Sequence, residues 1–259
     1  MVRISFRSLI PYTLVLTLAS GARGQTIHYG PESPLGDGTA RSYILLDGDR
    51  PLELGFALSE SALEGLPELA DAPDEEAFVL LDLEPPAENP TPFRLTAMDW
   101  NPRGHTPADV YDVPHFDFHF YLVDAGRRDA ILPEDPADYP AFEARGSRAP
   151  GSGMLPVDYA YAPESTVPQM GGHWVDPASH EFHGTAFDKT FIYGTWEGEV
   201  IFWEPMITKA YIESRPNAVV EVAVPEHVAT PGWYPTAYRV GFDEASKEYR
   251  IALVGFVER

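Results

Sequence analysis

Short segments with the composition of β-strands recur along most of the chain. They are rich in β-branched, aromatic and leucine residues, and turn-forming residues separate them. The chain has 21 glycines and 26 prolines, which interrupt regular structure often and disfavour long helices. The predicted strands are 41–47, 51–58, 77–83, 93–99, 115–123, 190–195, 199–205, 218–224, 234–242 and 248–257. This pattern predicts an all-β fold with a few minor, short helices.

Local signals predict some of the connections between these segments. Asp47-Gly48 is a typical hairpin turn, and residues 243–247 would join the last two strands in a second hairpin. A short helix is expected from Ser61, where Glu64 completes a capping box. Another is expected after Asp135-Pro136, because proline suits the first turn of a helix.

The stretch 124–172 is rich in proline, glycine and aspartate and is expected to be irregular. No repeat or linker divides the chain, so residues 25–259 are predicted to form a single β-rich domain. Hairpin connections favour antiparallel pairing. We therefore expect an antiparallel barrel or sandwich of a cupin- or calycin-like style.

The first 24 residues have the pattern of a secretory signal peptide. Arg3 and Arg7 form a basic start, an apolar run covers Leu9 to Leu18, and small residues precede a cleavage site after Gly24. The apolar run is shorter than the ~20 residues of a membrane-spanning helix. We expect the mature protein to be soluble and periplasmic or secreted, without membrane insertion after signal cleavage.

The charge and cysteine content exclude several classes of function. The net charge is −22, which repels nucleic acids and anionic lipid surfaces. Since there is no cysteine, disulfides, thiolate zinc sites, iron–sulfur clusters and a cysteine nucleophile are excluded. Only three of the 18 basic residues are lysines, and an acidic, lysine-poor surface is typical of proteins that stay soluble in high salt. A halophilic source and a GC-rich genome both account for this composition.

The segment His115 to Tyr121 alternates polar and apolar residues. On a strand, successive side chains point to opposite faces, so His115, Asp117, His119 and Tyr121 share one face, while phenylalanines form the other. The phenylalanine face belongs in a core. Two imidazoles and a carboxylate on one face are costly unless they are solvated, paired or bound to a metal.

The spacing of a strand limits which of these groups can share one ion. Neighbours two residues apart lie about 6.6 Å apart, whereas His115 and His119 lie ~13 Å apart. We therefore expect one histidine and Asp117 to be completed by groups from elsewhere, such as His173 or Glu204. Such a set suits a divalent transition metal, Zn, Mn, Fe or Ni. The predicted pocket contains His115, Asp117, His119, His173 and Glu204.

Each of these residues also has a structural interpretation. A histidine is commonly a hydrogen-bonded core residue, Asp117 could orient a histidine, and Glu204 could form a buried salt bridge. His105 lies in a turn-rich stretch and could reach the same pocket. The run 180–183, His-Glu-Phe-His, resembles a zinc-protease motif only superficially, because its histidines are three residues apart.

Several of these runs occur together in a fixed order. They are Trp-Asn-Pro-Arg-Gly-His-Thr-Pro at 100–107, Pro-His-Phe-Asp-Phe-His-Phe-Tyr at 114–121, Gly-Gly-His-Trp at 171–174, Ile-Tyr-Gly at 192–194 and Glu-Pro-Met-Ile-Thr at 204–208. The order resembles an uncharacterised family of exported prokaryotic proteins, a domain of unknown function that includes a Thermus protein under extracytoplasmic sigma-factor control. The resemblance implies a β-rich fold and a shared His/carboxylate site, and it supplies no reaction.

Three functions are consistent with this sequence. The first is an exported protein that binds a divalent metal or a small ligand without turnover. The second is a metal-dependent enzyme of hydrolase, lyase or oxygenase type, with Tyr121 or Glu204 as proton carrier. The third is a structural or interaction module whose histidines satisfy one another. The sequence also allows a homo-oligomer.

Overall fold

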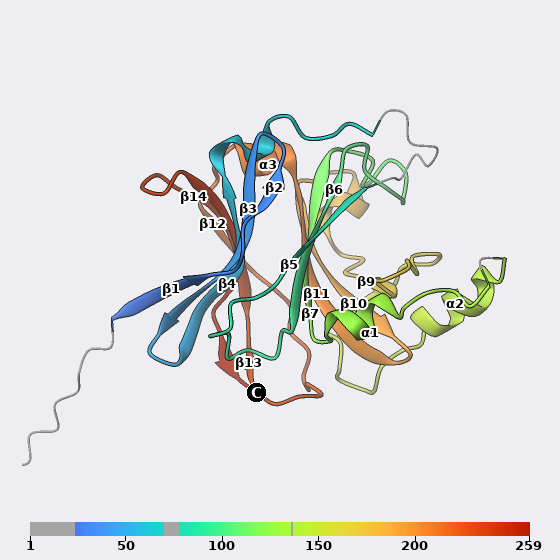
Figure 1. Cartoon of the computed structure of the whole chain (residues 1–259). Coiled ribbons are helices and arrows are strands. Elements are labelled where there is room, and N and C mark those ends of the chain that lie inside the picture. Colours follow the sequence, from blue (N-terminus) through green and yellow to red (C-terminus); the bar gives the residue numbers. More distant parts are fainter. Residues whose placement is uncertain (1–23, 70–77, 136) are drawn as a thin grey trace, which may run out of the picture.

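The computed structural model describes residues 24–69, 78–135 and 137–259. Apart from Gly24, the predicted signal peptide lies outside the described residues. Two seven-stranded sheets, antiparallel throughout, lie face to face (Figure 1). The first sheet contains β1 (Gln25–Tyr29), β2 (Ser33–Leu35), β3 (Gly38–Asp47), β4 (Arg50–Ser59), β12 (Ala218–Glu221), β14 (Ala237–Asp243) and β15 (Glu248–Val254).

The second sheet has the strand order β5-β6-β7-β11-β10-β9-β8. Its strands are β5 (Val79–Leu83), β6 (Leu95–Asn101), β7 (His115–Tyr121), β8 (Ala160–Tyr161), β9 (Gly172–Val175), β10 (Lys189–Trp196) and β11 (Glu199–Thr208). Short strands β13 (Trp233–Tyr234) and β16 (Val257–Glu258) form a separate pair. The helical segments are α1 (Ala125–Asp129), α2 (Tyr139–Gly146), α3 (Lys209–Glu213) and the 3-10 helices η1 (Glu60–Leu63) and η2 (His180–His183).

The main core lies between the two sheets. Phe56 of β4 packs against Phe118 and Phe120 of β7, with ring centroids 5.2 Å apart in both pairs. The predicted all-β fold is confirmed as an antiparallel sandwich. The barrel alternative is wrong, because the strands stay in two separate sheets and do not close. The cupin- or calycin-like style stays a prediction.

Each predicted strand segment overlaps an observed strand, although residue 77 lies outside the described residues, and both hairpins are confirmed. Asp47 and Arg50 pair across the first turn, where Gly48 has a φ of 62°. Asp243 and Glu248 pair across the second. Strands β1, β2, β8 and β9 were not predicted, because they are short and lie towards sheet edges, where sequence alternation is weak.

The helix predictions were partly right. The expected helix after residue 135 is α2, and the side chain of Asp138 caps it by accepting from the Ala141 N–H. The capping box at Ser61 is wrong, since η1 has no side-chain cap and the Ser59 hydroxyl instead accepts from Thr39 N–H of β3. The stretch 124–172 is also less irregular than expected, because it holds α1, α2 and β8.

Among the described residues, no helix is both long and apolar enough to cross a membrane. Helices α1 and α2 instead lie beside the second sheet, on the side away from the first (Figure 1). Phe142 of α2 packs against Trp196 of β10 in a second apolar cluster. This cover buries part of the outer face of the second sheet, and a separate cluster that includes Tyr111 and Phe187 covers Ile192 and Met206.

Candidate metal centres

The polar side chains of β7 lie on this covered outer face. His115 and His119 are 0% and 1% exposed, and Asp117 is 5% exposed. The phenylalanines of the same strand point into the main core. The predicted division of the strand into two faces is therefore confirmed, and the whole polar face lies away from solvent.

Both neighbours of β7 add acidic groups to this face. Asp99 of β6 pairs directly with Asp117. On β11, Phe202 pairs with Tyr121 and Met206 pairs with Asp117. Glu204 lies between those two positions, and since side chains alternate it shares their face and lies beside His119.

A first group of possible ligands consists of His119, His173 and Glu204. The Oε2 atom of Glu204 lies 3.5 Å from Nε2 of His119 and 4.0 Å from Nε2 of His173. Two ligand atoms bound to one zinc ion at about 2.1 Å with tetrahedral angles would lie about 3.4 Å apart. The three side chains are thus spaced for a single ion after a small adjustment at His173.

Strand pairing brings His173 to this place from a distant part of the chain. His173 of β9 pairs with Gly194 of β10. A Cβ atom at position 194 would overlap the ring of Phe202, so glycine is required for the packing next to His173. The carboxylate of Glu143 accepts from the backbone N–H groups of Glu164 and Thr166 and thereby holds the loop over His173.

Hydrogen bonds decide which nitrogen of His173 faces the group. Its Nδ1 lies 2.6 Å from the carbonyl oxygen of Ser165. A carbonyl can only accept, so Nδ1 carries the proton and Nε2 of the neutral ring presents a lone pair to Glu204. Burial lowers the pKa of His173 to about 4, which keeps the ring neutral at pH 7.

His119 lies between two carboxylates. Its Nδ1 is 3.6 Å from Oδ2 of Asp99, opposite the Nε2 that faces Glu204. No hydrogen bond reaches either nitrogen of His119, either oxygen of Asp99 or Oε2 of Glu204, although all are buried. Unsatisfied buried polar atoms are costly, and a metal ion at Nε2 with Asp99 on Nδ1 would satisfy them together.

The electrostatics of the first group favour cation binding. Burial lowers the pKa of His119 to about 3. Burial also raises the pKa of Glu204 well above its ordinary value, and the charges of Asp117 and Asp99 raise it further. A cation would offset the cost of placing three carboxylates near each other in the interior.

A second group consists of His105, His115 and Asp117. Nε2 of His115 lies 3.2 Å from Oδ1 of Asp117, and Nε2 of His105 lies 3.4 Å from Oδ2. Asn101 donates to Oδ2 of Asp117 at 2.8 Å. Burial would raise the pKa of Asp117, but the adjacent His115 and His105 outweigh this and hold it far below its ordinary value.

The structure therefore distributes the five predicted ligands over two groups. His115 and Asp117 lie in one, completed by His105, while His119, His173 and Glu204 form the other. His105 joins His115 and Asp117, whereas His173 and Glu204, which were expected to complete the Asp117 set, lie with His119 instead. The five residues therefore do not lie in the single group that was expected.

Asp99 and Asn101 were not among the predicted site residues. The alternation of β6 places both on one face of a strand whose residues are all buried. Polar residues at alternate positions of a buried strand were the signal that could have identified them.

Other candidate residues have different positions. The Tyr121 hydroxyl donates to the backbone carbonyl of Gln169 at 3.3 Å, and the ring stacks on His119 with centroids 5.4 Å apart. A catalytic role for Tyr121 or Glu204 stays a prediction. His180 and His183 lie on the 3-10 helix η2 and belong to neither group.

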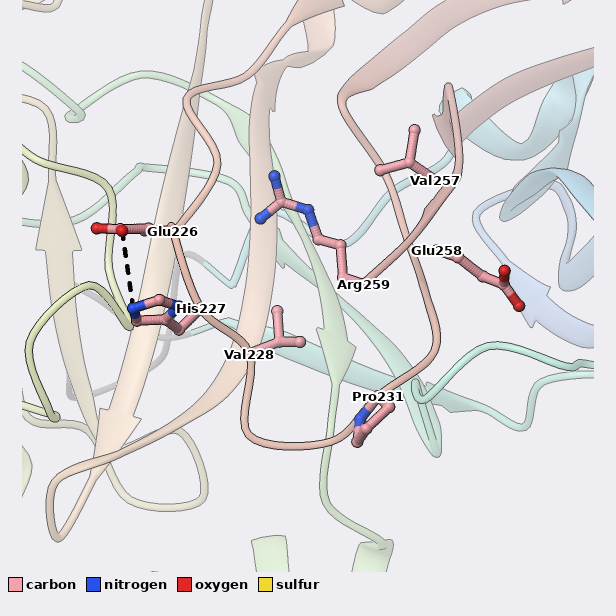
Figure 2. A pocket seen from close by; sticks show the side chains of 7 residues that line it. All are labelled: Glu226, His227, Val228, Pro231, Val257, Glu258 and Arg259. Carbon is pink, nitrogen blue, oxygen red and sulfur yellow. Dashed lines mark ion pairs between the residues drawn. The ribbon is translucent and has the colours of Figure 1, made fainter.

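Two surface cavities of about 560 and 680 Å³ have linings that include no residue of either group. In the smaller cavity, Nε2 of His227 lies 3.8 Å from Oε1 of Glu226, and Arg259 lies at the same surface (Figure 2).

Comparison with protein-family models, curated proteins and solved structures gives no match for this chain.

Proposed function

We propose that this is an exported, soluble protein that binds one divalent transition metal ion through His119, His173 and Glu204. The observation that carries the proposal is the set of buried, unsatisfied atoms that face one another there. Nε2 of His173 presents a lone pair to the carboxyl group of Glu204, and a cation between the two would satisfy both.

The burial of the group favours binding over turnover. The side chains of His119 and Glu204 are 1% and 2% exposed, and that of His173 is 14% exposed. Three protein ligands would leave a fourth position of a tetrahedral ion open, as in catalytic zinc sites, but neither surface cavity is lined by a residue of this group, so a substrate has no evident access to that position. We therefore place the binding function before the metal-dependent enzyme and before the structural module.

Metal content tests this proposal. The protein should be purified without an affinity tag or chelator and analysed for bound elements, together with His173→Ala and His227→Ala. Wild type and the His227 variant, whose histidine is exposed, should hold the ion of the first group, and His173→Ala should lose it. Equal metal content in wild type and His173→Ala would refute the site.

Export is tested by the N-terminus of the mature protein. If residues 1–24 act as a signal peptide, N-terminal sequencing of protein from an extracytoplasmic fraction should begin near Gln25. Detection of an intact residue 1 in that fraction would contradict the proposal.

A further inference from the structure

We propose that His105, His115 and Asp117 form a second cation site, which binds its own divalent metal ion and exchanges it faster than the first. The proposal stands on different atoms from the first site and does not depend on it. Its ligands come from β7 and from the loop that follows β6.

In both histidines of this group, the Nδ1 atom contacts a backbone carbonyl oxygen. Nδ1 of His115 lies 2.7 Å from the carbonyl oxygen of Val113, and Nδ1 of His105 lies 2.8 Å from that of Thr106. Because carbonyl oxygens only accept, both Nδ1 atoms are donors, so loss of the Nε2 proton, which metal binding requires, leaves a lone pair on Nε2 of each ring. The two lone pairs point to the same carboxylate.

Asp117 offers one oxygen to each ring. Its Oδ1 lies 3.2 Å from Nε2 of His115, and neither atom has a hydrogen-bond partner although both are buried. These separations of 3.2 and 3.4 Å are close to the roughly 3.0–3.4 Å expected between two ligands bound at about 2.1 Å with angles of 90 to 109°. Asn101 holds the carboxylate in place by donating to Oδ2.

The surroundings of His105 indicate faster exchange. Its side chain is 28% exposed, whereas that of His115 is 0% exposed. His105 is also on a loop, which closes back on itself through a hydrogen bond from the His105 N–H to the Tyr111 carbonyl. An ion can therefore enter or leave on the His105 side, and the first group has no comparably exposed ligand.

The experiment counts zinc equivalents and measures their release to a chromogenic chelator. Wild type, His105→Ala, Asp117→Asn, His173→Ala and the control His180→Ala are compared after equilibration with zinc alone. His180 is a suitable control because it is partly exposed and belongs to neither group. Thermal unfolding of each variant verifies that it is folded, and His105→Ala carries the test if Asp117→Asn does not fold.

Wild type and His180→Ala should release two equivalents in a fast and a slow phase. His105→Ala and Asp117→Asn should lose the fast phase and keep the slow one, and His173→Ala should lose only the slow one. Two equivalents in His105→Ala would overturn the second site. A single wild-type equivalent that disappears in both His105→Ala and His173→Ala would also overturn it, because the groups would then share one ion.

The two proposals fail separately. If wild type holds one equivalent that His173→Ala loses and His105→Ala keeps, the second site is wrong and the first stands. If the single equivalent is lost in His105→Ala alone, the first site is wrong and the second stands.

Discussion

The hydrogen bond on one ring nitrogen of a histidine decides what the other nitrogen can do. In His105, His115 and His173 the Nδ1 atom faces a backbone carbonyl, so Nε2 is the nitrogen turned towards a carboxyl group. His119 differs, because the carboxyl group of Asp99 faces its Nδ1 instead. These local contacts fix which nitrogen of each ring could bind a metal.

The lowered pKa of His173 makes the metal-free protein sensitive to acid. The unfolded chain takes up a proton near pH 6.5, whereas the folded protein takes it up only near pH 4. The free energy of unfolding should therefore fall as pH drops from 6.5 towards 4, and the lower pKa of His119 acts in the same direction. His173→Gln should reduce this slope by up to about 1.4 kcal/mol per pH unit.

Urea unfolding of chelator-treated protein across this pH range measures the slope. His227→Gln, which changes an exposed histidine, should keep the wild-type slope. Identical slopes for wild type and His173→Gln would show that His173 titrates alike in the folded and unfolded states.

Asp99 faces Nδ1 of His119 at 3.6 Å and belongs to neither ligand group. Asp99→Asn replaces the carboxyl group at Nδ1 of His119 and should weaken metal binding at the first group by about 10–100-fold. Competition against a chelator of known affinity measures the change, with Glu226→Gln, an exposed carboxylate, as the matched control. Unchanged affinity in Asp99→Asn would show that the carboxylate has no effect on the ligand.

At the scale of elements, the site depends on how closely β9, β10 and β11 pack. Gly194 pairs with His173 on β9 and leaves space for the ring of Phe202 on β11. Gly194→Ala should destabilise the protein by about 1–3 kcal/mol and also reduce metal binding, because the overlap must displace the ring or the strand.

Urea unfolding and metal content measure these two effects. Gly151→Ala is a suitable control, since a Cβ there makes only an ordinary contact with Met154. A stable Gly194→Ala variant with full metal content would mean that β10 and β11 can separate without disturbing His173.

The whole molecule carries 40 acidic against 18 basic residues, and several of its arginines are in ion pairs on the outer face of the first sheet. The excess negative charge causes self-repulsion, which salt screens as the Debye length falls from ~10 Å at 0.1 M to ~3 Å at 1 M. The melting temperature should therefore rise over this range of sodium chloride. A flat or falling melting temperature would contradict the halophilic interpretation of the composition.

Most of the strands were predictable because the signal is local. Alternation in β7 places His115, Asp117 and His119 on one face regardless of what packs on it, and the turn at Asp47-Gly48 needs only neighbouring residues. The single pocket was mispredicted because the approach of β9 and of the His105 loop depends on pairing and packing over long sequence distances.

The β class, the two faces of β7, and the oxygen and nitrogen chemistry that a chain without cysteine can offer a metal all follow from local sequence. Which groups come together depends on the tertiary structure. Residues two apart on a strand point the same way but lie about 6.6 Å apart. Two such side chains of β7 therefore contact a common partner only where another element brings a group between them. β11 and β9 bring Glu204 and His173 to His119, while a loop brings His105 to Asp117, and one polar strand thereby contributes to two groups of possible ligands.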